Sequence, residues 1–471
     1  MARRPSSRLS GPLARSSLPL QEQLYRRIRA AIARRQPGPG EKLPSVRTLA
    51  SELGVARGTV DTVYARLVGE GYLVTRGPAG TVVSPALAPD DPPPRPTPER
   101  SAPAMDRTPP EVRPFQMGLP AIDLFPRTLW GRLTARAAKR LTGAALAYPD
   151  PLGTPELREA IAAYLAVSRG VPCNAAQVIV TGGYQAGLSL IAQTLLSPGE
   201  RVWFEEPGYF LARQILQAAS AQLIPVPVDS HGMDVEAARK SVPRARLAVV
   251  TPAHQSPLGV ALSLPRRQRL LAWAAETGAW IVEDDYDGEF HYVGRKLPAL
   301  KSLDAADRVI YAGSFSKTLF PGLRLGYLVL PLQLVRPVVD AKRATSHGEA
   351  ILSQGVAADF LTDGHFGRHL KRMRGLYAAR RDALAAALRT TFGDRLTMSV
   401  EPGGMHLLTR FAGGGSDLEM VRRAGRAGLA PTALSTQFLG HTPDNGLLLS
   451  FTNIAEDQAL PLAKTLARAI A

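Results

Sequence analysis

The segment Gly313-Ser-Phe-Ser-Lys-Thr-Leu-Phe-Pro-Gly-Leu-Arg-Leu-Gly-Tyr327 decides the fold expected for most of this chain. It surrounds Lys317 with small hydroxyl residues and apolar side chains, and Arg324 follows on the C-terminal side. A lysine in such a setting can be held partly desolvated, which lowers its pKa and leaves a neutral amine able to attack an aldehyde. The hydroxyl groups and Arg324 would suit a phosphate. Taken alone, the segment fits an ordinary solvated loop lysine at least as well, so its interpretation depends on the rest of the chain.

The composition describes a multi-domain globular protein. At 471 residues the chain is too long for one ordinary core, so two or three domains are expected. The sequence contains no apolar run of about 18 residues, and its first ten residues lack the apolar core of a signal peptide. We therefore expect a cytoplasmic protein without a membrane segment. The single cysteine, Cys173, excludes an intramolecular disulfide, and no metal site is expected.

Positive charge is concentrated near the N-terminus. The chain carries a formal charge of +17, and residues 1–84 hold 14 Lys/Arg against 5 Asp/Glu. Such a basic segment attracts polyanions and releases their counterions, although a soluble basic tail can have the same composition. Charge alone therefore leaves nucleic-acid binding open.

Residues 19–84 have the pattern of three helices followed by a hairpin. Apolar residues recur with helical spacing over 20–32 and again over 60–67, and Ser45 can cap a short helix between them. Two short β segments then flank Gly77-Pro-Ala-Gly80. Helix, helix, tight turn, helix and hairpin is the order of a winged helix-turn-helix.

The segment Leu43-Pro-Ser-Val-Arg-Thr-Leu-Ala-Ser-Glu-Leu-Gly-Val-Ala-Arg-Gly-Thr-Val-Asp-Thr-Val-Tyr-Ala-Arg-Leu67 resembles the GntR family of bacterial repressors, and the match covers residues 20–83. In that family the second helix, the start of the recognition helix and a glycine-tipped wing touch DNA. The resemblance implies contacts from Arg47, Arg57, Thr59, Arg76, Gly77 and Gly80. Arginine suits this role because its planar guanidinium group can donate two hydrogen bonds to a phosphate or to the edge of guanine. Ala56 replaces the family's capping hydroxyl, which should weaken this helix start. A winged helix that binds protein is the alternative.

The segments on either side of this domain differ from it in composition. Residues 1–18 are basic and aperiodic, and we expect a disordered tail. Residues 85–114 contain eleven prolines and no apolar period, which predicts a semi-rigid, extended linker.

From residue 115 to the end, short apolar runs alternate with amphipathic helical stretches. This alternation of strand-like and helical segments favours an α/β fold whose mostly parallel sheet is covered by helices on both faces. The expected strands lie at 177–181, 201–204, 222–226, 246–251, 280–284 and 308–313. Long helical segments over 350–392 and strand-like pieces at 398–400, 405–410 and 447–451 suggest a smaller α+β part.

Several residues at the expected strand ends complement Lys317. The segment Gly182-Gly-Tyr-Gln-Ala-Gly187 follows one strand and begins a helix. The free backbone amides at such a helix start can bind a phosphate. Tyr209 follows the next strand and could stack on a planar ring. The strand 279–285 ends in acidic residues at the carboxyl edge of the sheet, where ligands bind. A carboxylate there could keep a pyridinium nitrogen protonated. Each residue alone fits an ordinary turn or core position, but together they predict a site for pyridoxal 5'-phosphate (PLP).

Residues 115–471 resemble the fold-type I aminotransferases, which are PLP-dependent. The resemblance implies that Lys317 bonds to the PLP aldehyde, Asp284 pairs with the ring nitrogen and Tyr286 reaches the ring hydroxyl. Tyr209 would stack on the ring. The phosphate would be held by Gly183, Tyr184, Ser314 and Arg324, with Tyr148 contributed by the partner subunit of a homodimer. The combination with a GntR-like domain resembles the MocR subfamily of transcriptional regulators. Two sequence motifs also resemble that subfamily: Thr251-Pro-Ala-His-Gln-Ser-Pro257 and Glu283-Asp-Asp-Tyr-Asp-Gly-Glu-Phe290.

Two positions depart from the aminotransferase pattern. Ser256-Pro257 stands where aminotransferases carry Asn-Pro, so the usual amide to the ring hydroxyl is missing. Leu448 stands where the family has the arginine that clamps the α-carboxylate of the substrate, and residues 427–467 contain no arginine. An amino acid bound here would lose a bidentate, charge-assisted contact and the orientation that transamination needs.

Three functions are compatible with these patterns. The favoured one is a PLP-dependent transcriptional regulator that binds a double-stranded DNA operator and senses a small effector, either PLP itself or an amine. The second is an active PLP-dependent aminotransferase with an accessory DNA-binding domain, against which Leu448 argues. The third is a DNA-binding protein whose C-terminal domain is a dimerisation scaffold without cofactor.

Overall fold

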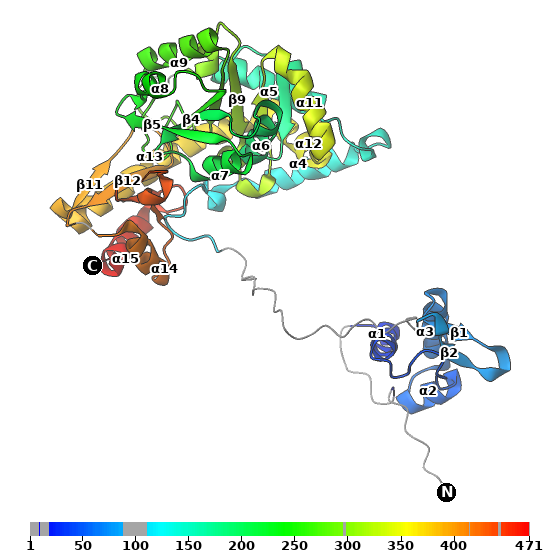
Figure 1. Ribbon diagram of the computed structural model, residues 1–471. Coiled ribbons are helices and arrows are strands. Elements are labelled where there is room, and N and C mark those ends of the chain that lie inside the picture. Colours follow the sequence, from blue (N-terminus) through cyan, green and yellow to red (C-terminus); the bar gives the residue numbers. More distant parts are fainter. Residues whose placement is uncertain are drawn as a thin grey trace. The chain divides into compact units, whose positions relative to one another are not determined.

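The computed structural model describes Leu9 and residues 18–87, 111–294, 298–413, 415–440 and 444–470. The chain divides into two compact units, Met1–Pro109 and Pro110–Ala471 (Figure 1). The boundary falls inside the segment expected as a linker, of which residues 88–110 lie outside the described residues. Of the expected N-terminal tail, residues 1–8 and 10–17 also lie outside them, whereas Leu9 is buried against the core of the N-terminal unit.

The N-terminal unit is the winged helix-turn-helix that the sequence predicted. Its elements are α1 (Leu20–Ala33), α2 (Val46–Leu53), α3 (Arg57–Gly69), β1 (Leu73–Thr75) and β2 (Thr81–Val83). α2 begins where the Ser45 hydroxyl accepts a hydrogen bond from the Thr48 amide at 3.1 Å. It ends at Gly54, whose φ of +65° suits glycine. The helices enclose a buried apolar core that includes Leu24, Ile28, Leu49, Val60 and Leu67.

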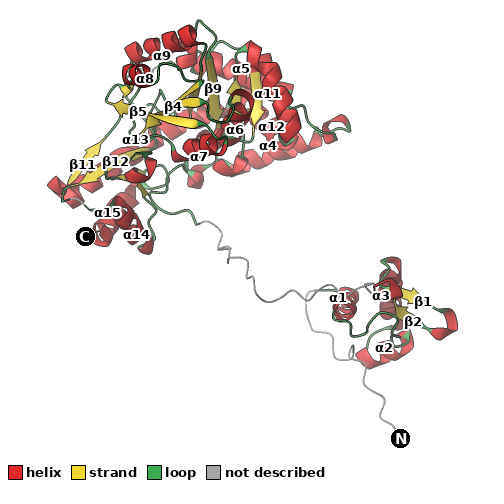
Figure 2. Cartoon of the chain, viewed as in Figure 1, coloured by secondary structure: helices red, strands yellow, loops and turns green. Residues whose placement is uncertain are grey.

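An eight-stranded sheet organises the C-terminal unit (Figure 2). Its strand order is β3-β10-β9-β8-β7-β4-β5-β6. The neighbours from β9 to β5 run parallel, β10 runs antiparallel to both β3 and β9, and β6 runs antiparallel to β5. The strands are β3 (Val178–Thr181), β4 (Arg201–Glu206), β5 (Gln222–Asp229), β6 (Gly232–Met233), β7 (Leu247–Val250), β8 (Trp280–Asp285), β9 (Val309–Ser314) and β10 (Gly326–Val329).

Helices cover both faces of this sheet, as expected for a mostly parallel sheet. Along β3, Val178 and Val180 belong to one buried apolar cluster and Ile179 to another, so both faces are sealed from water. The helices of this part are α4 (Arg127–Lys139), α5 (Pro155–Ser168), α6 (Tyr184–Leu195), α7 (Phe210–Ala218), α8 (Val235–Ser241), α9 (Leu264–Thr277), α10 (Phe315–Thr318), α11 (Leu332–Thr345) and α12 (Ile351–Thr362).

A smaller α+β part completes the C-terminal unit. Its antiparallel sheet has the order β11-β12-β14-β13. The elements are α13 (His365–Phe392), β11 (Leu396–Ser399), β12 (His406–Phe411), α14 (Asp417–Arg426), β13 (Thr432–Ala433), β14 (Leu447–Ser450) and α15 (Ala459–Ile470).

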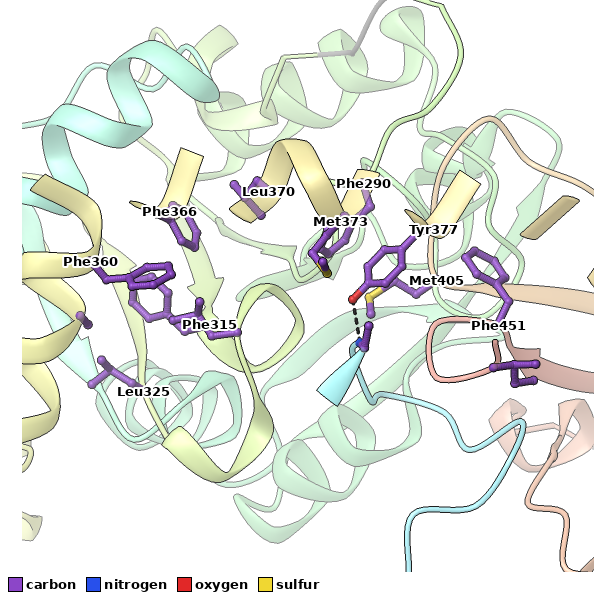
Figure 3. Close-up of a cluster of buried hydrophobic side chains, with 14 of the residues drawn as sticks. Phe290, Phe315, Leu325, Phe360, Phe366, Leu370, Met373, Tyr377, Met405 and Phe451 are labelled. Atoms are coloured by element: carbon purple, nitrogen blue, oxygen red, sulfur yellow. Dashed lines mark hydrogen bonds between the residues drawn. The ribbon is translucent and has the colours of Figure 1, made fainter. Parts of the chain in front are cut away.

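The long helix α13 connects the small part with the large one through a shared core. Phe366 of α13 packs near Phe315 and Phe360, and Tyr377 of the same helix lies near Met405 and Phe451 (Figure 3). The Tyr377 hydroxyl also accepts a hydrogen bond from the Ala121 amide at 2.9 Å. No helix among the described residues is long and apolar enough to span a bilayer.

Candidate cofactor site and DNA-binding surface

Lys317 lies just beyond the carboxyl end of β9, on the short helix α10. Its Nζ atom donates a hydrogen bond to the carbonyl oxygen of Gly118 at 2.9 Å. Gly118 has a φ of +84°, and a side chain there would start 2.7 Å from this nitrogen, so the close approach requires glycine. Burial lowers the pKa of Lys317, while the nearby carboxylates of Asp284 and Asp287 oppose this shift.

Asp284 lies at the same edge of the sheet as Lys317. It is near the end of β8, which pairs in parallel with β9, and its register partner there is Ala312. Burial raises the pKa of Asp284 well above its ordinary value, and Lys317 opposes this shift. The two groups therefore influence each other in one buried site. The Oδ1 atom of Asp284 is buried and has no hydrogen-bond partner at normal distance in the part of the chain that the structure describes.

Three tyrosines surround this carboxylate. Tyr184 opens α6 and Tyr209 immediately precedes α7, with their ring centroids 6.3 Å apart. Burial raises the pKa of Tyr209 to about 12, and Asp284 adds to the shift. Burial also raises the pKa values of Tyr184 and Tyr286, with Asp284 contributing to both. The hydroxyl groups of these two residues are buried and have no hydrogen-bond partner at normal distance among the described residues.

The antiparallel strand β10 brings the predicted phosphate ligands together. Its first residue, Gly326, pairs with Thr181 at the end of β3 and with Ser314 at the end of β9. A side chain on Gly326 would start 2.9 Å from the Cα of Gly183, so the loop after β3 packs directly against this strand. Arg324 precedes the strand by two residues and is exposed.

The backbone at these phosphate ligands has unusual conformations. Gly183, the residue before α6, has a φ of +100°, and a Cβ atom there would meet no heavy atom within 4 Å. Arg324 has a φ of +48°, a left-handed conformation that costs a non-glycine residue about 1–3 kcal/mol. The Ser314 hydroxyl accepts a hydrogen bond from the Ser316 amide at 3.1 Å, so its proton is free to be donated to a ligand.

Tyr148 stands apart from the other predicted cofactor residues. Its side chain is 90% exposed, and its ring lies 5.8 Å from the ring of His347. The chain does not bring it into its own site.

A second set of buried polar residues supports the site and was not singled out from the sequence. Glu205 at the end of β4 accepts hydrogen bonds from the Thr251 hydroxyl at 2.6 Å and from the Gln255 amide at 3.2 Å. His254 Nδ1 lies 3.1 Å from Asp287 Oδ1. Thr251, His254 and Gln255 all lie in the segment Thr251–Pro257. That motif could therefore have identified them as candidate site residues.

The position expected for a carboxylate-binding arginine is apolar. Leu448 of β14 is 1% exposed and packs with Leu408 of β12 and Leu434. Ser256, which replaces the expected asparagine, donates its backbone amide to the Thr251 hydroxyl at 3.0 Å.

The residues present fit PLP. Among the described residues, Asp284 Oδ1 and the hydroxyl groups of Tyr184 and Tyr286 have no hydrogen-bond partner at normal distance, although Tyr184 lies near Asp284 and Tyr286 near Asp287. A protonated ring nitrogen, a ring hydroxyl and a phosphate are groups that could satisfy them. The α6 N-terminus, preceded by a glycine and without a side-chain cap, is suited to an anion.

The predicted DNA contacts lie on the surface of the N-terminal unit. Arg57 is the first residue of α3, and Ala56 before it makes no side-chain cap, as the sequence predicted. Arg47 lies in the first turn of α2, and Thr59 is half-buried in the first turn of α3. Within residues 18–87, the side chains of Arg47 and Arg57 are exposed and have no ion-pair partner.

The wing carries the remaining predicted contacts. Arg76 and Gly77 are exposed at the tip, where the Arg76 amide donates to the Gly80 carbonyl at 2.9 Å. Gly80 has a φ of +93°, and a side chain there would start 2.8 Å from Cε of Lys42. Lys42, which is also exposed, is a basic residue beside the wing that was not predicted.

Arg66 is also exposed on α3, but its charge is paired within the domain. It forms ion pairs with Glu22 at 3.1 Å and with Glu70 at 2.9 Å, and its guanidinium lies 3.7 Å from the centroid of the Tyr25 ring. Arg66 therefore joins α3 to α1 within the domain.

Comparisons with known proteins agree with this architecture. The family model of the gntR family of bacterial regulatory proteins matches residues 20–83, and that of aminotransferase class I and II matches residues 130–425. The chain is 40% identical to the probable rhizopine catabolism regulatory protein MocR of Rhizobium meliloti, covering 93% of this chain and 91% of that protein. It is 36% identical to the pyridoxine biosynthesis transcriptional regulator PdxR of Corynebacterium glutamicum, covering 92% of both.

Solved structures show the same relationship for the C-terminal unit. The α-aminoadipate aminotransferase LysN from Thermus thermophilus, complexed with N-(5'-phosphopyridoxyl)-L-leucine, matches with a TM-score of 0.70 at 30% identity. The match covers 76% of this chain and 91% of that one. This chain therefore belongs to the MocR subfamily of GntR-family transcriptional regulators: it is a PLP-dependent, DNA-binding regulator with an aminotransferase class I and II domain.

Proposed function

We propose that occupancy of the cofactor site, by PLP alone or by PLP together with an amine effector, changes how the winged helix binds its operator. In this proposal residues 19–84 read DNA, residues 85–114 connect the domains and residues 115–471 sense the ligand. The protein would act as a homodimer in the cytoplasm, where it can reach the chromosome. The supporting observation is that Lys317, just beyond the carboxyl end of β9, and Asp284, near the carboxyl end of the neighbouring parallel strand β8, lie at one edge of the sheet in a chain that also carries a winged helix.

The residues of the site have distinct roles in this proposal. Burial lowers the pKa of Lys317, so more of its amine is neutral and can bond to an aldehyde. Asp284 would hold a proton on the ring nitrogen, which would give its buried carboxylate a cationic partner. Tyr286 would donate to the ring hydroxyl and Tyr209 would stack on the ring. PLP, when bound, supplies an aldehyde that reacts with primary amines and a ring that withdraws electrons.

The phosphate would be held where β3, β9 and β10 meet. The backbone amides after Gly183, the Ser314 hydroxyl and Arg324 would contact it, and the hydroxyl of Tyr184 lies at the same helix start. Tyr148 of the partner subunit would complete the set, because its side chain is exposed in its own chain.

On DNA, arginines would provide most of the contacts. Arg57 and Thr59 at the start of α3 and Arg47 on α2 would contact phosphates and base edges. The wing residues Arg76, Gly77 and Gly80 would approach the backbone of the duplex.

An active aminotransferase with an accessory DNA-binding domain is the second candidate function. Leu448 argues against it, because a buried leucine cannot bind and orient the α-carboxylate of an amino acid. Steady-state conversion of an amino donor and a keto acid would establish this alternative. A C-terminal scaffold without cofactor would instead give a colourless wild-type protein.

The test measures operator affinity as a function of ligand. Fluorescence anisotropy on the DNA next to the gene would compare the apo-protein, the PLP-bound protein and the PLP-bound protein with added amines. We expect the ligand to change the affinity by about 5–150-fold, the usual range of coupling between two sites. The Lys317→Ala variant should lose this response but still bind DNA. An equal affinity of wild type in all ligand states would refute control by the cofactor site.

A further inference from the structure

The strand β14 presents two different faces. Leu447 and Leu449 are fully buried in the main core of the C-terminal unit, which also includes residues of α13 and α15. Leu448 points to the opposite face, because side chains alternate along a strand. There it belongs to a separate apolar cluster, formed by Met117, Leu258, Leu408, Leu434, Phe438 and Leu448, which we call the apolar wall.

The apolar wall is connected to the cofactor site by its half-buried members. Met117 directly precedes Gly118, whose carbonyl accepts the hydrogen bond from Lys317. Leu258 directly follows Ser256-Pro257, at the position where aminotransferases contact the PLP ring hydroxyl. These two side chains are only half-buried, so part of their apolar surface remains available to a ligand.

Phe438 links the wall to the segment that carries Tyr209. The loop containing Phe438 is joined to this segment by a hydrogen bond from the Gly208 amide to the Gln437 carbonyl at 3.1 Å. Two backbone amides of the same loop, those of Leu439 and Gly440, donate to the Glu206 carboxylate at 2.8 Å. The wall is therefore held against the strand end that presents the ring-stacking tyrosine.

Two basic residues next to the wall are already engaged. Arg213 donates from Nη1 to the Phe438 carbonyl at 2.6 Å and from Nη2 to the Thr436 carbonyl at 3.1 Å. His406 Nε2 lies 2.8 Å from the Pro257 carbonyl, and burial lowers the pKa of His406, so the ring is neutral near pH 7. Neither group offers a bidentate pair of donors to a carboxylate.

We propose that the apolar wall is the effector subsite and that it selects a primary amine carrying an apolar group and no α-carboxylate. This inference rests on the proposed function, because the amine is recognised through the PLP aldehyde. A carboxylate placed against Met117, Leu258 and Phe438, the half-buried members of the wall, would lose water without gaining a bidentate cationic partner from Arg213 or His406, whereas an alkyl or aryl group would be removed from water favourably. The site thus excludes the α-amino acids that an aminotransferase of this fold would take.

A matched pair of ligands tests this selection on the wild-type, PLP-bound protein. L-Leucine and 3-methylbutylamine have the same branched alkyl group and differ by the α-carboxylate. Titration would follow the absorbance of the bound cofactor, with calorimetry as a second measurement of affinity. We expect 3-methylbutylamine to bind about tenfold or more tightly than L-leucine, which corresponds to about 1.4 kcal/mol. Equal or tighter binding of L-leucine would overturn the proposal.

Two variants at one position test the effect of a positive charge. Leu448→Arg should reverse the preference in favour of L-leucine, whereas Leu448→Gln, which is polar but shorter and uncharged, should not. A Leu448→Arg protein that binds PLP and still prefers the amine would count against the subsite. If this variant does not fold, the comparison of the two ligands on the wild type still decides.

The experiment also distinguishes this inference from the proposed function. Absence of a PLP absorbance band in the wild type would refute the proposed function. Selective binding of 3-methylbutylamine without any change in operator affinity would support the subsite and refute the regulatory coupling. Preferential binding of L-leucine that does change operator affinity would support the coupling and refute the subsite.

Discussion

At the scale of single residues, the protonation of Lys317 is set by two opposing effects. Burial lowers its pKa, and the Asp284 carboxylate raises it again. Removing the carboxylate in Asp284→Asn should therefore lower the pKa of Lys317 further. The rate at which the apo-protein takes up PLP, followed by absorbance and by reductive trapping on the lysine, should reach its half-maximum at a lower pH than in the wild type. An unchanged or higher midpoint would contradict the effect, and Lys317→Ala should show no trapping at any pH.

The DNA contacts proposed for the exposed arginines of the winged helix can be tested by single substitutions. Arg57→Ala should weaken operator binding and reduce the slope of log affinity against log salt by about 1, because one phosphate contact is lost. Arg26→Ala removes the same charge from α1, where the arginine pairs with Glu22, and should leave the slope nearly unchanged. Equal slopes for Arg57→Ala and wild type would show that α3 does not face the DNA as proposed.

Some residue roles depend on contacts that the sequence does not reveal. Arg66, like Arg57, is an exposed arginine of α3. Only the fold shows that Arg66 forms ion pairs with Glu22 and Glu70. The Glu205 network joins residues 46 and 50 positions apart, so the sequence shows Thr251 and Gln255 within one motif but not their pairing with Glu205. Lys317 and Asp284 could be proposed as candidates because their neighbours in sequence carry the signal, and the fold places both at one edge of the sheet.

At the scale of elements, the buried strands were the most predictable part of the fold. The six apolar runs expected in the large sheet correspond to β3, β4, β5, β7, β8 and β9. β10 was missed because its residues, Gly326–Val329, overlap the end of the lysine segment, whose glycines indicated a loop. β6 and β13 are two residues long, which is too short for any periodicity to be visible.

The turn between β3 and α6 offers a prediction about one glycine. Gly183→Ala should cost about 1–3 kcal/mol in backbone strain at its φ of +100°, and it should also weaken PLP binding by disturbing the amides at the helix start. Gly199→Ala introduces an alanine at a φ of +84° in a loop before β4, also with no atom within 4 Å. It should lower stability without changing PLP affinity. Equal PLP affinities of the two variants, measured by titration of the apo-proteins, would remove Gly183 from the phosphate site.

At the scale of the whole molecule, composition was enough to separate the two units. The change from a basic, helix-patterned segment to proline-rich sequence and then to alternating strands and helices predicted the division, and the boundary falls at Pro109–Pro110. Composition carries no information on how two subunits assemble, however. The assembly is expected only from the resemblance that places Tyr148 in the site of a partner subunit.

The exposed Tyr148 allows this assembly to be tested by mixing two defective chains. If the phosphate contact comes from the partner subunit, Tyr148→Phe homodimers should bind PLP about 10–150-fold more weakly, because a hydrogen bond to a charged group contributes about 1.5–3 kcal/mol. Lys317→Ala homodimers should form no covalent bond to PLP.

In a heterodimer of the two variants, one site combines Lys317 of one chain with Tyr148 of the other and is intact, while the second site lacks both. Co-expressed and purified through two different tags, the heterodimer should therefore bind one PLP with wild-type affinity. If Tyr148 instead served its own chain, the only site with Lys317 would lack the hydroxyl, and the affinity would equal that of the Tyr148→Phe homodimer.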